Sequence, residues 1–117
     1  MGPNVLVFGW NRSLPGREML SGQHFQEFSE FLAALQKDKR IESFDAVLLE
    51  PHGGTFNGCF LIRGEPARLG ELTASPEWAR HITRAMLHLD GACVLRGMAG
   101  QALQERLQLW MESIPKP

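Results

Sequence analysis

The sequence predicts an α+β fold with one four-stranded antiparallel sheet, the element order βαββαβ and an extra helix at the C-terminal end. The strongest signal is a β-hairpin, because residues 46–64 form two apolar segments joined by a glycine-rich turn. In residues 17–37 apolar side chains recur at intervals of three and four, which predicts a long amphipathic helix. Since 117 residues are the usual size of one domain, we expect a single domain over residues 1–117.

Local signals predict the other elements of the first half. Residues 5–10 are rich in β-branched and aromatic side chains and are followed by turn-forming residues, so they predict the first strand. The two strands of the hairpin are expected at residues 44–50 and 58–63. A short helix is expected at residues 67–73.

A second long helix is expected to begin at Ser75, which is a favoured N-cap and is followed by proline and glutamate. We expect it to end near Thr83. Residues 86–89 and 92–95 predict a fourth strand that is interrupted by a bulge or a bend. Residues 101–113 carry leucine, tryptophan and methionine at helical spacing and predict the C-terminal helix.

The predicted strands are apolar on both faces. In residues 58–63, Phe60 and Ile62 point to one side of the sheet, whereas Cys59 and Leu61 point to the other. The two crossover helices of this element order cover one face only. Each large apolar side chain left in water costs about 1.5–3 kcal/mol. We therefore expect a second copy of the chain to cover the free face.

The element order, the glycine-rich hairpin and the two-sided strands resemble the dimeric α/β-barrel superfamily, in which two ferredoxin-like subunits pack sheet against sheet. The resemblance extends over nearly the whole chain and rests on layout. The run Pro51-His52-Gly53-Gly54 and the pair Gly9-Trp10 resemble an uncharacterised branch. The superfamily includes small monooxygenases and muconolactone isomerase-like enzymes. The resemblance implies a ferredoxin-like domain and a homodimer, and it assigns no catalytic residue.

Charge and hydropathy exclude several partners. Twelve basic and 13 acidic residues give a net charge of −1, and the basic residues are scattered, which argues against nucleic-acid binding. The apolar runs are too short to span a bilayer and no leader pattern is visible, so we expect a cytoplasmic protein that is not bound to membranes. Cys59 and Cys93 lack metal-site spacing, which favours buried reduced thiols, while a bridge between them stays open.

His52 is the first candidate for catalysis and for ligand binding. It follows a predicted strand and precedes Gly53 and Gly54, where the backbone allows a ligand to approach closely. An imidazole at this place could act as an acid or a base near neutral pH. The alternative is a turn residue whose ring bonds to its own loop.

Trp10, Arg12 and Arg63 are further candidates for ligand binding. An indole beside a guanidinium could hold a planar anion at the mouth of a barrel. Alternatively, Trp10 caps the core and Arg12 pairs with a carboxylate. Arg63 closes a predicted strand and could line a cavity, although arginines at strand ends usually reach solvent.

His88 and Asp90 form a second catalytic candidate, because in a regular strand they share a face and can pair. The spacing of His24, His81 and His88 is not that of metal ligands. We therefore expect no metal and no cofactor.

Three functions are compatible with this sequence. The leading hypothesis is a homodimeric α/β-barrel protein that binds a small, partly apolar molecule between its sheet and helices or at the barrel mouth. The second is a cofactor-independent enzyme like the monooxygenases or isomerases, with His52 or the pair of His88 and Asp90 as base. The third is a structural or interaction module with a filled barrel.

Overall fold

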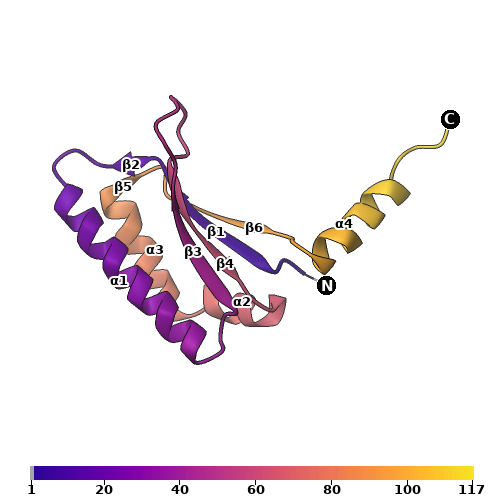
Figure 1. The fold of residues 1–117 in the computed structure, drawn as a ribbon, viewed down its shortest axis with the longest axis horizontal. Coiled ribbons are helices and arrows are strands. Elements are labelled where there is room, and N and C mark those ends of the chain that lie inside the picture. Colours follow the sequence, from indigo (N-terminus) through magenta and orange to yellow (C-terminus); the bar gives the residue numbers. More distant parts are fainter. Residues whose placement is uncertain (1) are drawn as a thin grey trace.

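A computed structural model describes residues 2–117 (Figure 1). Its main sheet has the strand order β3-β4-β1-β6, and all neighbouring strands are antiparallel. The strands are β1 (Val5–Trp10), β3 (Ser43–Leu48), β4 (Gly58–Arg63) and β6 (Cys93–Gly97). The predicted α+β class with four antiparallel strands is confirmed.

Three helices pack on one face of this sheet, and a fourth projects away from the body (Figure 1). The packed helices are α1 (Glu18–Lys37), α2 (Pro66–Thr73) and α3 (Pro76–His88), and the projecting helix is α4 (Gln101–Glu112). All four coincide with predicted helices, although α3 is longer than expected. None of the helices in residues 2–117 combines the length and the apolar character needed to cross a membrane.

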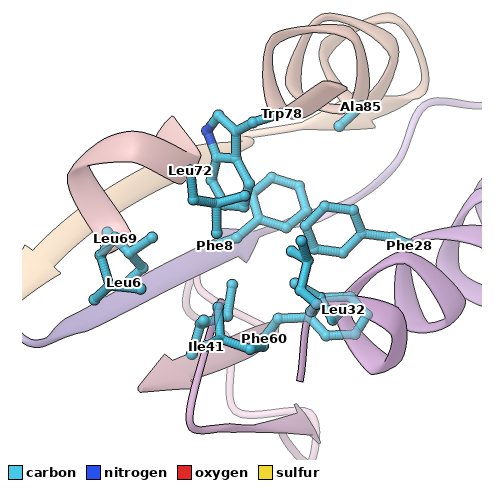
Figure 2. Packing of buried hydrophobic residues seen from close by; sticks show 12 residues of the cluster. Leu6, Phe8, Phe28, Leu32, Ile41, Phe60, Leu69, Leu72, Trp78 and Ala85 are labelled. Atoms are coloured by element: carbon cyan, nitrogen blue, oxygen red, sulfur yellow. The ribbon is translucent and has the colours of Figure 1, made fainter. Parts of the chain in front are cut away.

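The hydrophobic core lies between the sheet and the packed helices. Figure 2 shows Phe8 and Phe60 of the sheet pointing toward Phe28 of α1. Leu72 of α2 and Trp78 of α3 belong to the same cluster. The rings of Phe28 and Phe60 meet edge to face with centroids 5.0 Å apart, a favourable aromatic geometry. This packing fixes the position of α1 on the sheet.

The predicted end of α3 is wrong. Its start is as expected, since the Ser75 hydroxyl accepts a hydrogen bond from the backbone N–H of Trp78 at 3.2 Å. The helix then continues to His88 and includes three residues that were predicted as strand. Ala85 and His88 are buried at helical spacing, whereas the apolar residues between them face solvent. Hydrophobicity alone therefore misled the prediction.

A two-stranded ladder follows α3 directly. It pairs β5 (Leu89–Asp90) with β2 (Arg12–Ser13) and is separate from the main sheet. The backbone N–H of Leu14 adds a hydrogen bond to the carbonyl oxygen of His88 at 2.8 Å. This ladder holds the end of α3 against the segment that precedes α1.

No helix of residues 2–117 covers the face of the sheet opposite α1, α2 and α3 (Figure 1). Leu61, Val7 and Leu95 lie in register across it, and Leu95 is 51% exposed. Arg63 and Asp45 form an ion pair of 2.8 Å toward one edge. This face is therefore apolar at its centre and charged at its rim, and a single chain forms an open sheet instead of a closed barrel.

Candidate functional site

A pocket of about 260 Å³ lies between the first half of α1 and the end of the sheet that carries the hairpin loop. Most of its wall is aromatic and consists of Phe8, Trp10, Phe25, Phe28 and Phe60. The rest of the apolar wall is formed by Leu48, Leu89 and Gly22. Hydroxyl and imidazole groups form the remaining wall, and none of the described residues that line this pocket is charged.

The aromatic wall depends on a glycine in the neighbouring strand. Trp10 lies opposite Gly58 in the register of β1 and β4. A Cβ atom at Gly58 would lie 2.7 Å from the indole, so the ring rests directly on the glycine backbone. Phe25 of α1 meets the indole edge to face, with centroids 6.3 Å apart. Trp10 is thus held between the sheet and α1.

The polar wall belongs to a continuous series of hydrogen bonds, which we name the Ser–His network. Ser13 Oγ lies 2.7 Å from Ser21 Oγ, which lies 2.8 Å from His88 Nδ1. His88 Nε2 lies 2.8 Å from His24 Nδ1, and His24 Nε2 lies 3.0 Å from His81 Nδ1. Five side chains are joined in a row, and the first four line the pocket.

Three elements bring these side chains together. Ser21 and His24 are three residues apart on α1 and therefore share one helix face. His81 and His88 are seven residues apart on α3, which is about two turns. The ladder of β2 and β5 places Ser13 beside the end of α3. The network thus exists only because α3 reaches residue 88.

The histidines of the network are neutral at pH 7. Burial, together with the positive charge of Arg84, lowers the pKa of His24 to about 4. The same two causes lower the pKa of His81 and of His88. Glu27, which pairs with Arg84, acts in the opposite direction on His24 and His81 without reversing the shift. Each neutral ring carries one N–H donor and one acceptor nitrogen.

The structure places His88 and Asp90 differently from the predicted pair. His88 ends α3 and is buried against α1, where its partners are Ser21 and His24. Asp90 is exposed and accepts a hydrogen bond of 2.8 Å from the side chain of Asn11. The two residues do not pair because residue 88 belongs to a helix and not to a regular strand.

His52 lies in the exposed hairpin loop and does not line the pocket. Its Nδ1 accepts a hydrogen bond from the backbone N–H of Gly54 at 3.2 Å. Its Nε2 lies 2.8 Å from the carbonyl oxygen of Phe56 and donates to it. Both ring nitrogens bond to the backbone of the loop itself. This is the arrangement expected if His52 is a turn residue, the alternative given above to a catalytic role.

Of the other predicted binding residues, all but Trp10 also lie away from the pocket. Arg12 is exposed on β2, and Arg63 pairs with Asp45 on the uncovered face of the sheet. Gly53 has a φ of 84° in the hairpin turn, a left-handed conformation that glycine adopts readily. Trp10 is the one predicted binding residue that lines the pocket.

The sequence interpretation missed Ser13, Ser21, His24 and His81 as members of a site. A signal was present for Ser21, His24 and His81. The first two are spaced to share one face of a helix, and His81 lies seven residues, or about two helical turns, before His88. Reading it required the correct end of α3. The described residues contain no group of three or more histidine, cysteine or acidic side chains arranged to hold a metal ion.

No protein-family model matches this chain, and no curated protein matches its sequence. Among solved structures, it is similar to a dimeric protein of unknown function and ferredoxin-like fold from Bacteroides fragilis NCTC 9343. The two share 15% sequence identity over 81% of this chain and 95% of the other, with a TM-score of 0.56. This similarity confirms the ferredoxin-like fold, and at this identity it concerns the fold alone.

Proposed function

We propose that this chain is a homodimeric small-molecule-binding protein whose ligand occupies the pocket between α1 and the sheet. The observation that carries the proposal is the pocket itself, in which five aromatic rings face a wall of hydroxyl and imidazole groups. Ligand sites typically combine apolar walls with a few polar groups that fix orientation. An apolar cavity of about 150 Å³ holds benzene, so about 260 Å³ has room for one substituted ring.

The charge of the wall defines the ligand further. No charged side chain lines the pocket, and the two histidines that do are neutral at pH 7. Burying a charged ligand without a partner of opposite sign is costly. The ligand is therefore uncharged and aromatic or otherwise apolar over most of its surface.

The proposed homodimer is supported by the large solvent-accessible surface area of the single chain. A compact monomer of 13.1 kDa exposes about 6,400 Å², whereas this chain exposes 7792 Å². The difference, about 1,400 Å², is more than the roughly 800 Å² that each partner buries in a standard interface. The apolar face of the sheet and the projecting α4 contribute to this excess, and the similar structure from Bacteroides fragilis is dimeric. Two copies joined sheet to sheet would enclose an α/β barrel.

The binding proposal is tested by filling the pocket from α1. Gly22 lines the pocket, and a Cβ atom there would meet nothing within 4 Å, so Gly22→Leu adds a side chain without a backbone clash. Isothermal titration with phenol, acetophenone and toluene should detect binding to the natural chain. Gly22→Leu should weaken it about tenfold or more.

Two controls accompany this variant. Gly22→Ala changes the same position but leaves most of the pocket open, and Gly70→Leu adds the same side chain to open space on α2. Both should bind the probes as the natural chain does. Equal binding by Gly22→Leu would place the ligand elsewhere, and no binding of any probe would refute the proposed ligand class.

A second candidate function is acid–base catalysis on a ligand in the same pocket. It is favoured by the hydrogen bond of 2.8 Å between His88 Nδ1 and Ser21 Oγ in the pocket wall, because this arrangement lets an imidazole nitrogen accept a proton through the serine hydroxyl. The natural chain should then accelerate exchange of the methyl hydrogens of acetophenone for deuterium in D₂O, followed by NMR. His88→Gln should abolish the acceleration, and His52→Ala tests the predicted base in the hairpin loop. Exchange at the uncatalysed rate would exclude this activity for the probe.

A further inference from the structure

The Ser–His network runs without a break from the pocket to the outer part of α3. Its four links are all between 2.7 and 3.0 Å, and both nitrogens of His24 are used within it. His81 stands at the far end, half-buried, with its ring nearly parallel to that of His24 at an interplanar angle of 7°. At the near end, the two serine hydroxyls face the pocket.

We propose that the Ser–His network is the polar anchor of the pocket and that it binds either a carbonyl or a hydroxyl oxygen of an uncharged aromatic ligand by reversing the direction of its hydrogen bonds. This inference rests on the proposed function and adds to it the ligand groups that the site recognises.

Two arrangements of hydrogens satisfy every link of the network. If His88 Nδ1–H donates to Ser21 Oγ, then His88 Nε2 must accept from His24 Nδ1–H, and His24 Nε2 must accept from His81 Nδ1–H. All three rings then carry their hydrogen on Nδ1. If the Ser21 hydroxyl donates to His88 Nδ1 instead, the same argument places the hydrogen of all three rings on Nε2.

The two arrangements present different groups to the pocket. In the first, Ser21 accepts from His88 and its own O–H is free to donate, directly or through Ser13, to a ligand carbonyl. In the second, the hydroxyl hydrogens point into the network and the serine oxygens accept from a ligand hydroxyl. The pocket can therefore receive a donor or an acceptor without leaving a buried polar atom unpaired, which would cost free energy.

Outside the network itself, the hydroxyl of Ser13 has only distant partners among residues 2–117. Ser13 Oγ lies 3.4 Å from the carbonyl oxygens of both Leu14 and His88. These distances are long for an O–H···O hydrogen bond, which is normally 2.5–3.0 Å. A ligand oxygen is thus a better partner than the protein provides.

The reversal balances in hydrogens and in charge. Passing from the first arrangement to the second moves one hydrogen across each link toward the serines. His81 loses its Nδ1 hydrogen and takes one from water at Nε2, while one hydrogen leaves at the serine end to water. The network has the same charge before and after, so no imidazolium has to be buried between α1 and α3.

The test observes the ring nitrogens directly. Protein labelled with ¹⁵N-histidine is examined by NMR, which distinguishes protonated from unprotonated ring nitrogens, during titration with acetophenone, phenol and toluene. Saturating acetophenone should place the hydrogens of His24, His81 and His88 on Nδ1, and phenol should place them on Nε2. Toluene should bind without changing the distribution found in the free protein. Identical tautomers with acetophenone and phenol would overturn the anchor alone, whereas absence of all binding would overturn the proposed function and the anchor with it.

A matched pair of variants provides a second measurement. Ser21→Ala breaks the network, and Ser29→Ala removes a hydroxyl on the same helix that bonds to the carbonyl oxygen of Phe25. Ser21→Ala should weaken the binding of phenol and acetophenone roughly five- to tenfold, the effect of one hydrogen bond, and should leave toluene unchanged. Ser29→Ala should change none of the three affinities. Equal affinity of Ser21→Ala and the natural chain for all three probes would contradict the proposal.

Discussion

His24 illustrates how one buried side chain limits the chemistry of its surroundings. It is 3% exposed, and both ring nitrogens bond to other imidazoles. Protonation would place a charge between α1 and α3, close to the guanidinium of Arg84. The neutral ring therefore belongs to the folded state, and the charged ring favours unfolding.

This preference predicts acid sensitivity. In the unfolded chain His24 titrates near 6.5, whereas in the folded chain burial and Arg84 lower its pKa to about 4. Between these values the unfolded state binds more protons, so the free energy of unfolding should fall as the pH falls from about 6.5 to 4. The loss from His24 alone is about 3 kcal/mol at pH 4. Urea unfolding at a series of pH values measures it.

A comparison with His24→Phe isolates this effect from other titrating groups. The variant keeps an aromatic ring beside Phe28 but carries no titrating nitrogen. It should be less stable than the natural chain at pH 7, because the network loses two hydrogen bonds, and its stability should depend less on pH between 6.5 and 4. The same pH dependence in both proteins would show that His24 is not the cause.

Two positions in the central strands require glycine because an aromatic ring lies directly against the backbone there. Trp10 covers Gly58 on the helix side of the sheet, and on the other side Phe56 covers Gly9, where a Cβ atom would lie 2.3 Å from the ring. Glycine inside a strand normally weakens it. Here each glycine accommodates a ring, one in the pocket wall and one that fastens the hairpin loop to the sheet.

Helices and strands with a clear spacing of apolar residues were predictable from the sequence. The exception was the C-terminal end of α3, which was predicted as a strand. The period of three and four residues in α1 and the apolar strands of the hairpin decide those elements locally. In residues 86–89, however, a short apolar run fits a strand or a helix equally well. The choice is made by burial of Ala85 and His88 against α1, which is a tertiary effect.

The error in α3 propagated to the candidate site. A strand at residue 88 would have placed its imidazole near Asp90, whereas the helix turns it toward Ser21 and His24. Contacts between α1, α3 and β2 depend on how three elements pack, and no local pattern encodes them. This explains why Trp10 and His88 could be selected from the sequence and their actual partners could not.

The molecule as a whole is more extended than a chain of this length needs to be. Its radius of gyration is 16.2 Å, against about 13 Å for a compact domain of 117 residues. The extension comes from α4, which projects from the sheet (Figure 1). Its start is fixed by Asn4, whose side chain exchanges two hydrogen bonds of 2.9 Å with the backbone of Ala99. Beyond this attachment, Leu107 and Trp110 are 45% and 61% exposed.

A second copy would cover these surfaces, so the natural chain should have twice the mass of 13.1 kDa in light scattering. Leu95→Glu introduces a charge on the uncovered face at the edge strand β6, where the leucine is already 51% exposed, so we expect the monomer to tolerate the change. We expect this variant to be monomeric, because the dimer would bury an unpaired carboxylate.

Leu87→Glu is the matched control, since Leu87 is 63% exposed on α3 and lies outside that face. It should remain dimeric. The thiols of Cys59 and Cys93, which flank Gly9 on the same face, supply an independent reading. They should react slowly with a thiol reagent in the dimer and faster in Leu95→Glu. A natural chain that scatters as a monomer, or a Leu95→Glu protein that stays dimeric, would show that the sheet face is not the interface.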